Sequence, residues 1–197
     1  MPFKEVIATL NELQKRKIIA DYALCGGYAV SCYLQFADIK DLDIIVSVKS
    51  QEGFRELYDY CKRCNYFVIH LAPPRKGVKI ENIYLAGRKV ALRLGLNYID
   101  DLPVQFIPGY TCDLFEEAVS NAHWITVEDF PVKVISVEYL AAMLLKAFRQ
   151  KDRKRIIGLL EKADIETLNE ILLRHDSQED GLKNKLGKIL KTSFRSV

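Results

Sequence analysis

The chain has 197 residues, of which 49% are hydrophobic and 28% charged, and its formal net charge is +3. A chain of this length suits one compact domain, or one domain with a small helical appendage, and its ordinary globular composition argues against a disordered protein. The five cysteines, an odd number, argue against a disulfide scaffold. The small positive charge is weak support for a polyanionic partner, so the placement of the charges matters more.

The N-terminal residues predict an amphipathic helix that ends near Lys17, because their apolar residues recur at helical spacing: Phe3, Val6, Ile7, Leu10 and Leu13. These residues contain no signal-peptide core. No apolar run approaches the roughly 18 residues that are needed to cross a bilayer. We therefore expect a cytoplasmic protein with no membrane partner.

The next part of the chain alternates between strand and helix patterns. In chain order, it predicts a strand over 22–25, a helix over 28–36, a strand over 41–48, a helix over 51–64 and a strand over 66–70. From Lys79 the apolar residues recur at every second position, which predicts strands over 80–85, 89–94 and 103–107. The pattern then predicts a short helix over 114–122 and a hairpin over 125–135.

From Ser136, which has the character of an N-cap, the pattern is almost entirely helical as far as Lys191. The sequence therefore predicts an α/β module with a mixed sheet flanked by helices over 1–135, and a helical module over 136–197. No linker rich in Pro, Gly or Ser separates the two modules. We therefore expect the helices to pack on the first module.

Several residues that could suggest chemistry have a simpler structural interpretation. Cys61 and Cys64 form a C-x-x-C pair at the end of a predicted helix, and no second pair completes a tetrahedral zinc site. We interpret them as two half-buried thiols one turn apart. Trp124 is expected in the core. The three histidines are far apart in sequence and receive no metal or catalytic role: His70, His123 and His175.

The first candidate for a ligand site is the predicted strand that runs into Gly26-Gly27 and then into a helix. Glycine lets the backbone approach a ligand closely, and the first N–H groups of a helix have no partner within that helix. These donors and the helix dipole favour a phosphate by about 0.3–1 kcal/mol per interaction. A glycine pair after a strand is more often a simple tight turn, so this feature alone leaves both interpretations open.

The second candidate is the pair Asp41 and Asp43, which opens the next predicted strand. Residues two apart in a strand face the same side, about 6.6 Å apart at Cα, so the two carboxylates project together. A cation relieves their repulsion, and Mg²⁺ takes carboxylate oxygens and keeps positions open for substrate phosphates. A solvated acidic strand entry is the alternative. Together with the glycine pair, the pattern favours a metal-bound nucleotide, whose phosphates need both features at once.

The run ALCGGYAVSCYLQFADIKDLDIIV, residues 23–46, resembles the core motif of the DNA polymerase beta-type nucleotidyltransferases. It looks most like the bacterial branch that includes abortive-infection and type IV toxin–antitoxin nucleotidyltransferases. The helical run EYLAAMLLKAFRQKDRKRIIGLLE, residues 138–161, looks like the downstream Lys-plus-Arg-Lys-Asp segment of that branch. The resemblance implies a nucleotidyltransferase fold and metal-dependent transfer of a nucleoside monophosphate from an NTP to a hydroxyl on RNA, a protein or a small molecule.

The resemblance also implies roles for particular residues. Gly26 and Gly27 match the family's phosphate-binding pair, and Tyr28 stands where many members carry a small hydroxyl residue that touches the terminal phosphates. Asp41 and Asp43 match the catalytic carboxylates that hold two metal ions, Mg²⁺ or Mn²⁺.

The downstream segment supplies further matches. Lys146 matches a family lysine expected near the triphosphate or the acceptor, and Lys151 and Asp152 match a pair beside the site that receives no definite role. The segment Lys146–Arg155 carries six basic residues and one Asp. It could clamp a triphosphate or an RNA backbone, and a solvated helix face is the alternative.

The main departure from the family pattern is Gln105, which stands where the family carries a third carboxylate. A neutral amide is a poor ligand for the metal ion on the side of the nucleophile. Asp100 or Asp101 could replace it only if the strand register differs from the predicted one. The sequence therefore leaves two alternatives to an enzyme: a module that binds a nucleotide without turnover, and a toxin–antitoxin component that acts by binding a cognate partner protein.

Overall fold

The computed structural model describes the following parts of the chain: residues 2–35, 42–63, 67–68, 92–93, 104–127, 129–177 and 181–193. Within them the helices are α1 (Pro2–Lys15), α2 (Gly26–Tyr33), α3 (Gln51–Arg63), α4 (Asp113–Ser120), α5 (Val137–Ala147), α6 (Arg153–Leu160), α7 (Ile165–His175) and α8 (Leu182–Ser193). The strands are β1 (Asp21–Cys25), β2 (Leu42–Ser47), β3 (Phe67–Val68), β4 (Leu92–Arg93), β5 (Val104–Pro108), β6 (His123–Val127) and β7 (Phe130–Val134). Two short 3₁₀ turns, η2 (Gly109–Thr111) and η3 (Gln150–Asp152), complete the described elements.

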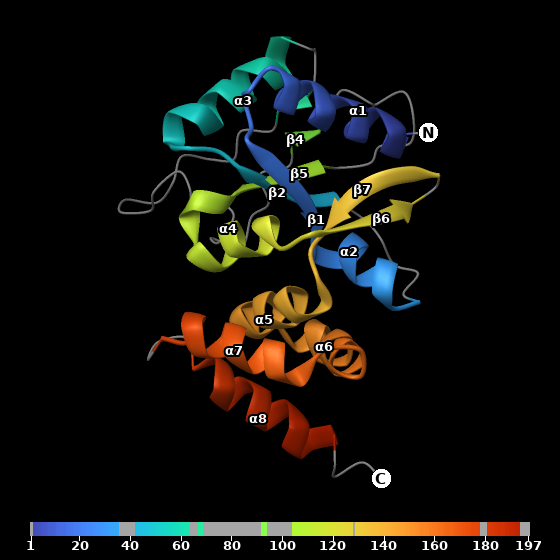
Figure 1. Cartoon of the computed structure of the whole chain (residues 1–197), viewed down its shortest axis with the longest axis vertical. Helices are drawn as coiled ribbons and strands as arrows, with labels where there is room; N and C mark the ends of the chain where they lie inside the picture. The colour runs from blue at the N-terminus through green and yellow to red at the C-terminus, as the bar shows by residue number, and fades with distance from the viewer. Residues whose placement is uncertain are drawn as a thin grey trace.

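The described strands form one mixed sheet in the order β3-β4-β5-β2-β1-β7-β6 (Figure 1). At its centre, β2 pairs antiparallel with β1 and parallel with β5, and β1 pairs parallel with β7. The expectation of an α/β fold with a mixed sheet flanked by helices is therefore confirmed. The predicted strands over 80–85 and 89–94 lie outside the described residues, apart from the two residues of β4.

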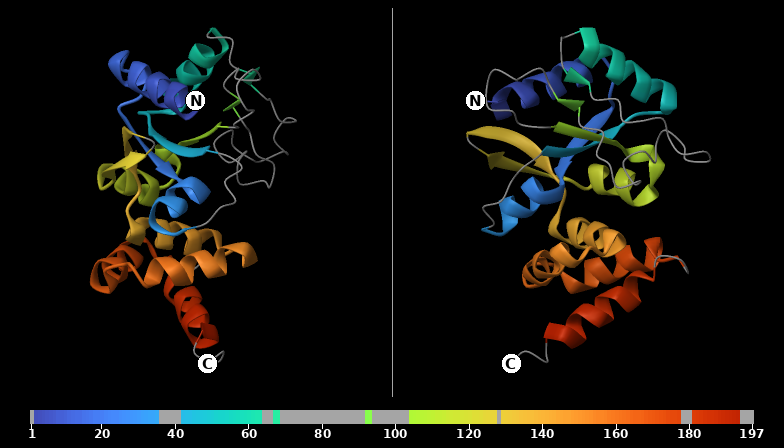
Figure 2. Two further views of the ribbon diagram at one scale, coloured as in Figure 1. Left: turned by 90° about the vertical axis from the view of Figure 1, so that its right-hand side faces the viewer. Right: turned by 180° about the vertical axis from the view of Figure 1, so that it is seen from behind.

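Alternation along β2 divides its side chains between two helical layers. Leu42, Ile44 and Val46 are fully buried on one face of the sheet. On the other face, Ser47 donates a hydrogen bond to Glu116 of α4 at 2.7 Å, so Asp43 projects toward the layer that contains α4. In Figures 1 and 2, α1 and α3 cover one side of the sheet, whereas α2, α4 and α5 lie on the opposite side.

The N-terminal helix α1 packs on the sheet through one apolar stripe. Val6, Leu10 and Leu13 are fully buried, as their helical spacing predicts. The helix ends at Lys15, two residues before the predicted end. Its buried stripe packs into the same core as the sheet.

The C-terminal helices pack directly on the α/β part of the molecule, where α5 contacts α2 and α4. A cluster centred on Glu117 of α4 adds polar contacts. The Tyr139 hydroxyl of α5 donates to Oε1 of Glu117 at 2.7 Å, and Nη2 of Arg174 in α7 donates to the same oxygen at 2.6 Å. Nε2 of His175 lies 2.6 Å from the other oxygen. Three helices, α4, α5 and α7, therefore share one carboxylate.

The position of Trp124 corrects a sequence-based expectation, because its side chain is 61% exposed rather than part of the core. Trp124 lies on β6, the edge strand of the sheet, and the ammonium of Lys133 on β7 lies 5.8 Å from the ring centroid. An aromatic residue on an edge strand can therefore leave one face to solvent, and its period-2 pattern does not reveal which face. Among the residues described, no helix is long and apolar enough to cross a membrane.

Candidate functional site

The candidate site begins where β1 ends and α2 starts. Gly26, the first residue of α2, has a backbone φ of +63°, which lies in the left-handed region that favours glycine. A Cβ atom added at Gly26 would lie 2.8 Å from both Cβ and Cγ of Asp43 and closer still to Oδ2. Glycine is therefore required at this position twice, by the backbone conformation and by the close approach of the Asp43 carboxylate.

Strand register places Asp43 between two neighbours on the same face of the sheet. Asp43 pairs with Cys25 on β1 and with Gln105 on β5. The predicted alignment of Gln105 with a third carboxylate thus corresponds to a position directly beside Asp43, and Gln105 is 8% exposed. The predicted partner of Asp43 in the D-x-D pattern, Asp41, and the alternatives Asp100 and Asp101 lie outside the described residues.

The Asp43 carboxylate is electrostatically unusual. Burial raises the pKa of Asp43 to about 6, against the opposing effect of the positive charges of Arg149, Lys151 and Arg155. Among the described residues, no side chain donates a hydrogen bond to this carboxylate. A buried carboxylate that faces several cations without a direct partner is typical of a site that receives a ligand.

Two arginines approach this place, Arg149 from the segment between α5 and η3 and Arg155 from α6. Asp152, in η3, is completely buried and accepts a hydrogen bond from Nε of Arg149 at 2.6 Å and one from Nη1 of Arg155 at 3.4 Å. A Cβ atom added at Gly27 would lie 3.9 Å from Nη2 of Arg155. Asp152 therefore fixes the position of Arg155, whose guanidinium lies at the N-terminus of α2.

Lys151 and Asp152, for which the sequence indicated no definite role, have definite positions in the structure. Lys151 is exposed, and its charge is one of those that act on Asp43. Asp152 organises the neighbouring arginines instead of facing the site itself. Arg149 and Arg155 were missed as individual site residues, although both lie inside the basic segment that the sequence singled out. The available signal was that both arginines stand three residues from Asp152, although Arg149 has an extended backbone and lies outside the helices.

Two other predicted nucleotide-binding residues have less distinctive positions. Tyr28 stacks on Phe3 of α1 with ring centroids 5.1 Å apart and an interplanar angle of 11°. Lys146 lies in the last turn of α5, where its carbonyl oxygen accepts a hydrogen bond from Lys185 at 3.3 Å. Lys146 is not among the cations that shift the pKa of Asp43. Their roles in nucleotide binding stay predictions.

The described residues fit a hard cation only in part. Within the described ranges, no group of three or more His, Cys, Asp and Glu side chains is placed to hold a metal ion. The carboxylate of Asp43 and the amide oxygen of Gln105 come from paired positions on neighbouring strands, and oxygen is the ligand that Mg²⁺ prefers. Mg²⁺ usually needs only one or two carboxylates when substrate phosphates supply further ligands. The donor set therefore suits an ion that arrives with a phosphate group.

Comparison with solved structures relates the whole architecture to known proteins. An antigenic nucleotidyltransferase-like protein from Paracoccidioides brasiliensis matches with a TM-score of 0.50 and 15% identity, over 93% of this chain and 91% of that one. ANT(2″)-Ia in complex with adenylyl-2″-tobramycin matches with a TM-score of 0.53 and 12% identity, over 89% of this chain and 97% of that one. A solution structure of the antibiotic-resistance factor ANT(2″)-Ia matches with a TM-score of 0.54 and 13% identity, over 95% of this chain and 100% of that one.

These matches cover nearly the full length of each chain, so they include the C-terminal helices as well as the sheet. At this level of identity they establish the fold, and the chain has a nucleotidyltransferase fold. No protein-family model matches the sequence, and no curated protein matches it.

Proposed function

We propose that this protein is a nucleotidyltransferase that moves a nucleoside monophosphate from an NTP to a hydroxyl group of an acceptor. The observation that carries the proposal is the contact between the Asp43 carboxylate and Gly26 at the first turn of α2. This contact brings a carboxylate and the first N–H groups of a helix to one place, where the charges of Arg149, Lys151 and Arg155 also act. A metal-bound triphosphate needs all three.

Residues of the chain itself would bind the triphosphate. The N-terminus of α2 supplies backbone donors and the positive end of the helix dipole. Arg155 adds a guanidinium beside Gly27, and Arg149 and Lys151 add charges that act at Asp43. Planar guanidinium groups bind phosphate oxygens in pairs, so the arginine held by Asp152 would orient the triphosphate as well as attract it.

Asp43 and Asp41 would hold Mg²⁺ or Mn²⁺, with the phosphates of the substrate completing the coordination. When bound, such an ion supplies charge neutralisation at the phosphates and lowers the pKa of the attacking hydroxyl. Asp43 must be ionised to act as a ligand. With a pKa of about 6 it is mainly ionised at neutral pH, and a bound cation would favour the ionised form further.

The acceptor is the least constrained part of the proposal, and RNA, a protein and a small molecule all present hydroxyl groups. One structural neighbour holds an adenylyl group joined to tobramycin, which makes small polyhydroxyl compounds a sensible first class to test. A cognate partner protein of the toxin–antitoxin kind stays a prediction from the sequence resemblance. Growth arrest on expression, relieved by a neighbouring gene, would test it.

The direct test is transfer of label from each NTP, carried on the α-phosphate, to cellular RNA, protein or small-molecule extracts in the presence of Mg²⁺ or Mn²⁺. The wild-type protein should label one acceptor class, and Asp43→Asn should not. Asp113→Asn is a matched control, because Asp113 is an exposed aspartate in the first turn of α4. Equal labelling by wild type and Asp43→Asn would contradict the proposal.

A second candidate function is nucleotide binding without turnover, and the position of Gln105 directly beside Asp43 favours it. A neutral amide at this position leaves the nucleophile side of the site with one carboxylate fewer than the family pattern. This candidate predicts stabilisation by NTP of about 2.7 kcal/mol at a hundredfold excess over Kd, with no product. Gln105→Asp should then gain transfer activity. Turnover by the wild-type protein would exclude it.

A further inference from the structure

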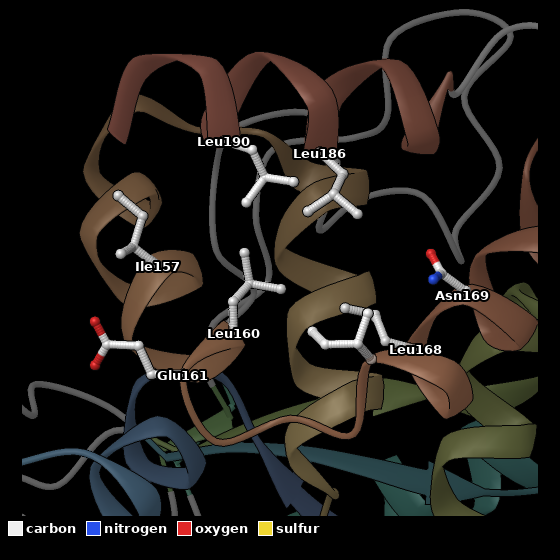
Figure 3. A pocket seen from close by; sticks show the side chains of 8 residues that line it. Ile157, Leu160, Glu161, Leu168, Asn169, Leu186 and Leu190 are labelled. Carbon is white, nitrogen blue, oxygen red and sulfur yellow. The ribbon is translucent and has the colours of Figure 1, made fainter. Parts of the chain in front are cut away.

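An apolar groove lies among the C-terminal helices, away from the candidate active site. Its volume is about 350 Å³, and α6, α7 and α8 line it. In Figure 3, Leu186 and Leu190 point from α8 toward Leu160 of α6 and Leu168 of α7. The groove is therefore a gap in the packing of three helices rather than a polar ligand site.

Large apolar side chains continue from the groove onto the protein surface. Leu190 of α8 is 41% exposed, Ile165 of α7 is 51% exposed and Leu173 of α7 is 62% exposed. Three of the four large hydrophobic residues that are exposed in the described part of the chain thus belong to two neighbouring helices. Exposed apolar area costs roughly 25 cal/mol per Å², and a contiguous patch commonly marks a contact with another molecule.

The two walls of the groove carry opposite charges. At 100° per residue, Glu166 and Glu170 lie beside Leu173 on the outer edge of α7, and both are exposed. On α8, Lys183 and Lys191 are exposed on the outer edge that Leu190 adjoins. Apart from a 3.9 Å contact between Glu170 and Arg174, these four side chains form no ion pair with other described residues.

The outer edge of α8 also carries a residue without a side chain, Gly187. Gly187 lies between Lys183 and Lys191 on the helical face, and a Cβ atom added there would meet no atom within 4 Å. Glycine in a helix interior costs about 0.5–1 kcal/mol relative to alanine. A glycine at this position would allow another helix to approach α8 closely.

We propose that this face is a homodimer interface, in which a second copy of the chain covers the groove. A twofold axis parallel to the groove places α7 of each copy over α8 of the other. The acidic edge of each copy then meets the basic edge of its partner, and the apolar residues that line the groove meet at the centre. An isologous contact requires such self-complementarity. The inference does not depend on the proposed enzymatic activity.

Charge reversal tests this pairing without changing the apolar centre. The acidic edge is reversed by Glu166→Lys with Glu170→Lys, and the basic edge by Lys183→Glu with Lys191→Glu. Sedimentation velocity on the full chain should show a wild-type dimer at micromolar concentrations. In each double variant alone, like charges face one another twice, so the dimer dissociation constant should rise about tenfold or more.

An equimolar mixture of the two double variants sharpens the test, because every contact in the mixed dimer joins opposite charges again. With one variant isotopically labelled, native mass spectrometry should find the mixed dimer in large excess over both homodimers. Glu5→Lys with Glu56→Lys, on α1 and α3, is a control with the same change in net charge as Glu166→Lys with Glu170→Lys, and it should dimerise as wild type does. A monomeric wild type would assign the groove to another partner and overturn the proposal. A mixture that dimerises no better than its components would overturn it as well.

Discussion

Asp43 and Glu117 are two acidic residues on the same side of the sheet, and the pKa values of their carboxyl groups shift in opposite directions. Burial raises the pKa of Asp43 to about 6 despite three nearby cations. Burial also raises the pKa of Glu117, but hydrogen bonds from Tyr139, Arg174 and His175 outweigh this effect and lower the pKa to about 2.

The difference lies in the direct partners. Glu117 accepts hydrogen bonds that satisfy both of its oxygens, so it joins α4 to the C-terminal helices and stabilises the fold. Around Asp43, the cations act through space, and the arginines among them donate instead to Asp152. A carboxylate that is satisfied within the protein contributes to stability, whereas one that is left without donors favours an external cation or phosphate complex.

The largest expected effect of this contrast is on activity. Asp43→Asn should reduce nucleotidyl transfer by at least about a hundredfold, because it removes a charge that the reacting phosphates and metal require. Glu117→Gln should leave the rate per folded molecule within a few-fold of wild type. Steady-state transfer rates of both variants, corrected for folded fraction, measure the contrast. Similar losses in both variants would remove the distinction drawn between the two residues.

The second expected effect is on stability: Asp43→Asn, which reduces activity, should stabilise the folded protein. The pKa of Asp43 is higher in the folded protein than its ordinary value of 3.8, so ionisation disfavours the folded state. Stability from this residue is therefore present below about pH 4 and lost as the pH rises through 6. In metal-free buffer at pH 8, Asp43→Asn should stabilise the protein by about 1–3 kcal/mol. Urea unfolding at pH 8 and pH 4 measures it, and the gain should vanish at the lower pH.

Glu117→Gln should destabilise the protein by about 1–2 kcal/mol at neutral pH, after allowance for solvent screening at this partly exposed site. The folded pKa of Glu117 lies below its ordinary value of 4.5. Its contribution is therefore present above about pH 4.5 and is lost as the pH falls toward 2. The difference in unfolding free energy between wild type and variant should shrink over that acid range. A constant difference would indicate a packing effect unrelated to charge.

The buried carboxylate of Asp152 should affect nucleotide binding more than chemistry. Asp152→Asn leaves a neutral side chain of the same size, but it weakens the restraint on Arg149 and Arg155. The Kd for NTP should rise about tenfold, and its dependence on salt should change little because both arginines stay charged. Isothermal titration at two ionic strengths measures both quantities. Arg155→Ala, by comparison, should raise Kd and also reduce the salt dependence.

The smallest expected effect concerns the edge of the sheet. Trp124→Ala should change the unfolding free energy by no more than about 0.5 kcal/mol, because the ring is largely exposed on β6. Thermal unfolding measures this. A loss of several kcal/mol would mean that Trp124 is buried in solution.

Local patterns were sufficient to predict most of this architecture. The alternation around Asp43 predicted β2 and the face on which that side chain lies, because the side-chain period of a strand is local. The glycine pair was predicted as a turn before a helix over 28–36, whereas α2 spans Gly26–Tyr33 and includes both glycines in its first turn. The resemblance aligned Gln105 with a third carboxylate on a later strand, and the strand register pairs Gln105 with Asp43.

The rest depends on long-range packing. The sequence singled out the basic segment Lys146–Arg155, but it did not indicate that Arg155 returns to the first turn of α2. The expectation for Trp124 was wrong because hydrophobic character does not distinguish a central strand from an edge strand. Such choices are made by the order of strands in the sheet, which no local pattern specifies.

The central claim is that the start of α2 and the Asp43 carboxylate form one pocket for a metal-bound triphosphate. A crystal structure with Mn²⁺ and a non-hydrolysable NTP analogue tests it most directly, because manganese is located by its anomalous scattering. We predict a manganese peak bonded to Asp43 and to phosphate oxygens, with the triphosphate against the N–H groups of Gly26 and Gly27 and beside Arg155. Manganese and triphosphate bound elsewhere, with the Asp43 carboxylate contacting neither, would contradict the account.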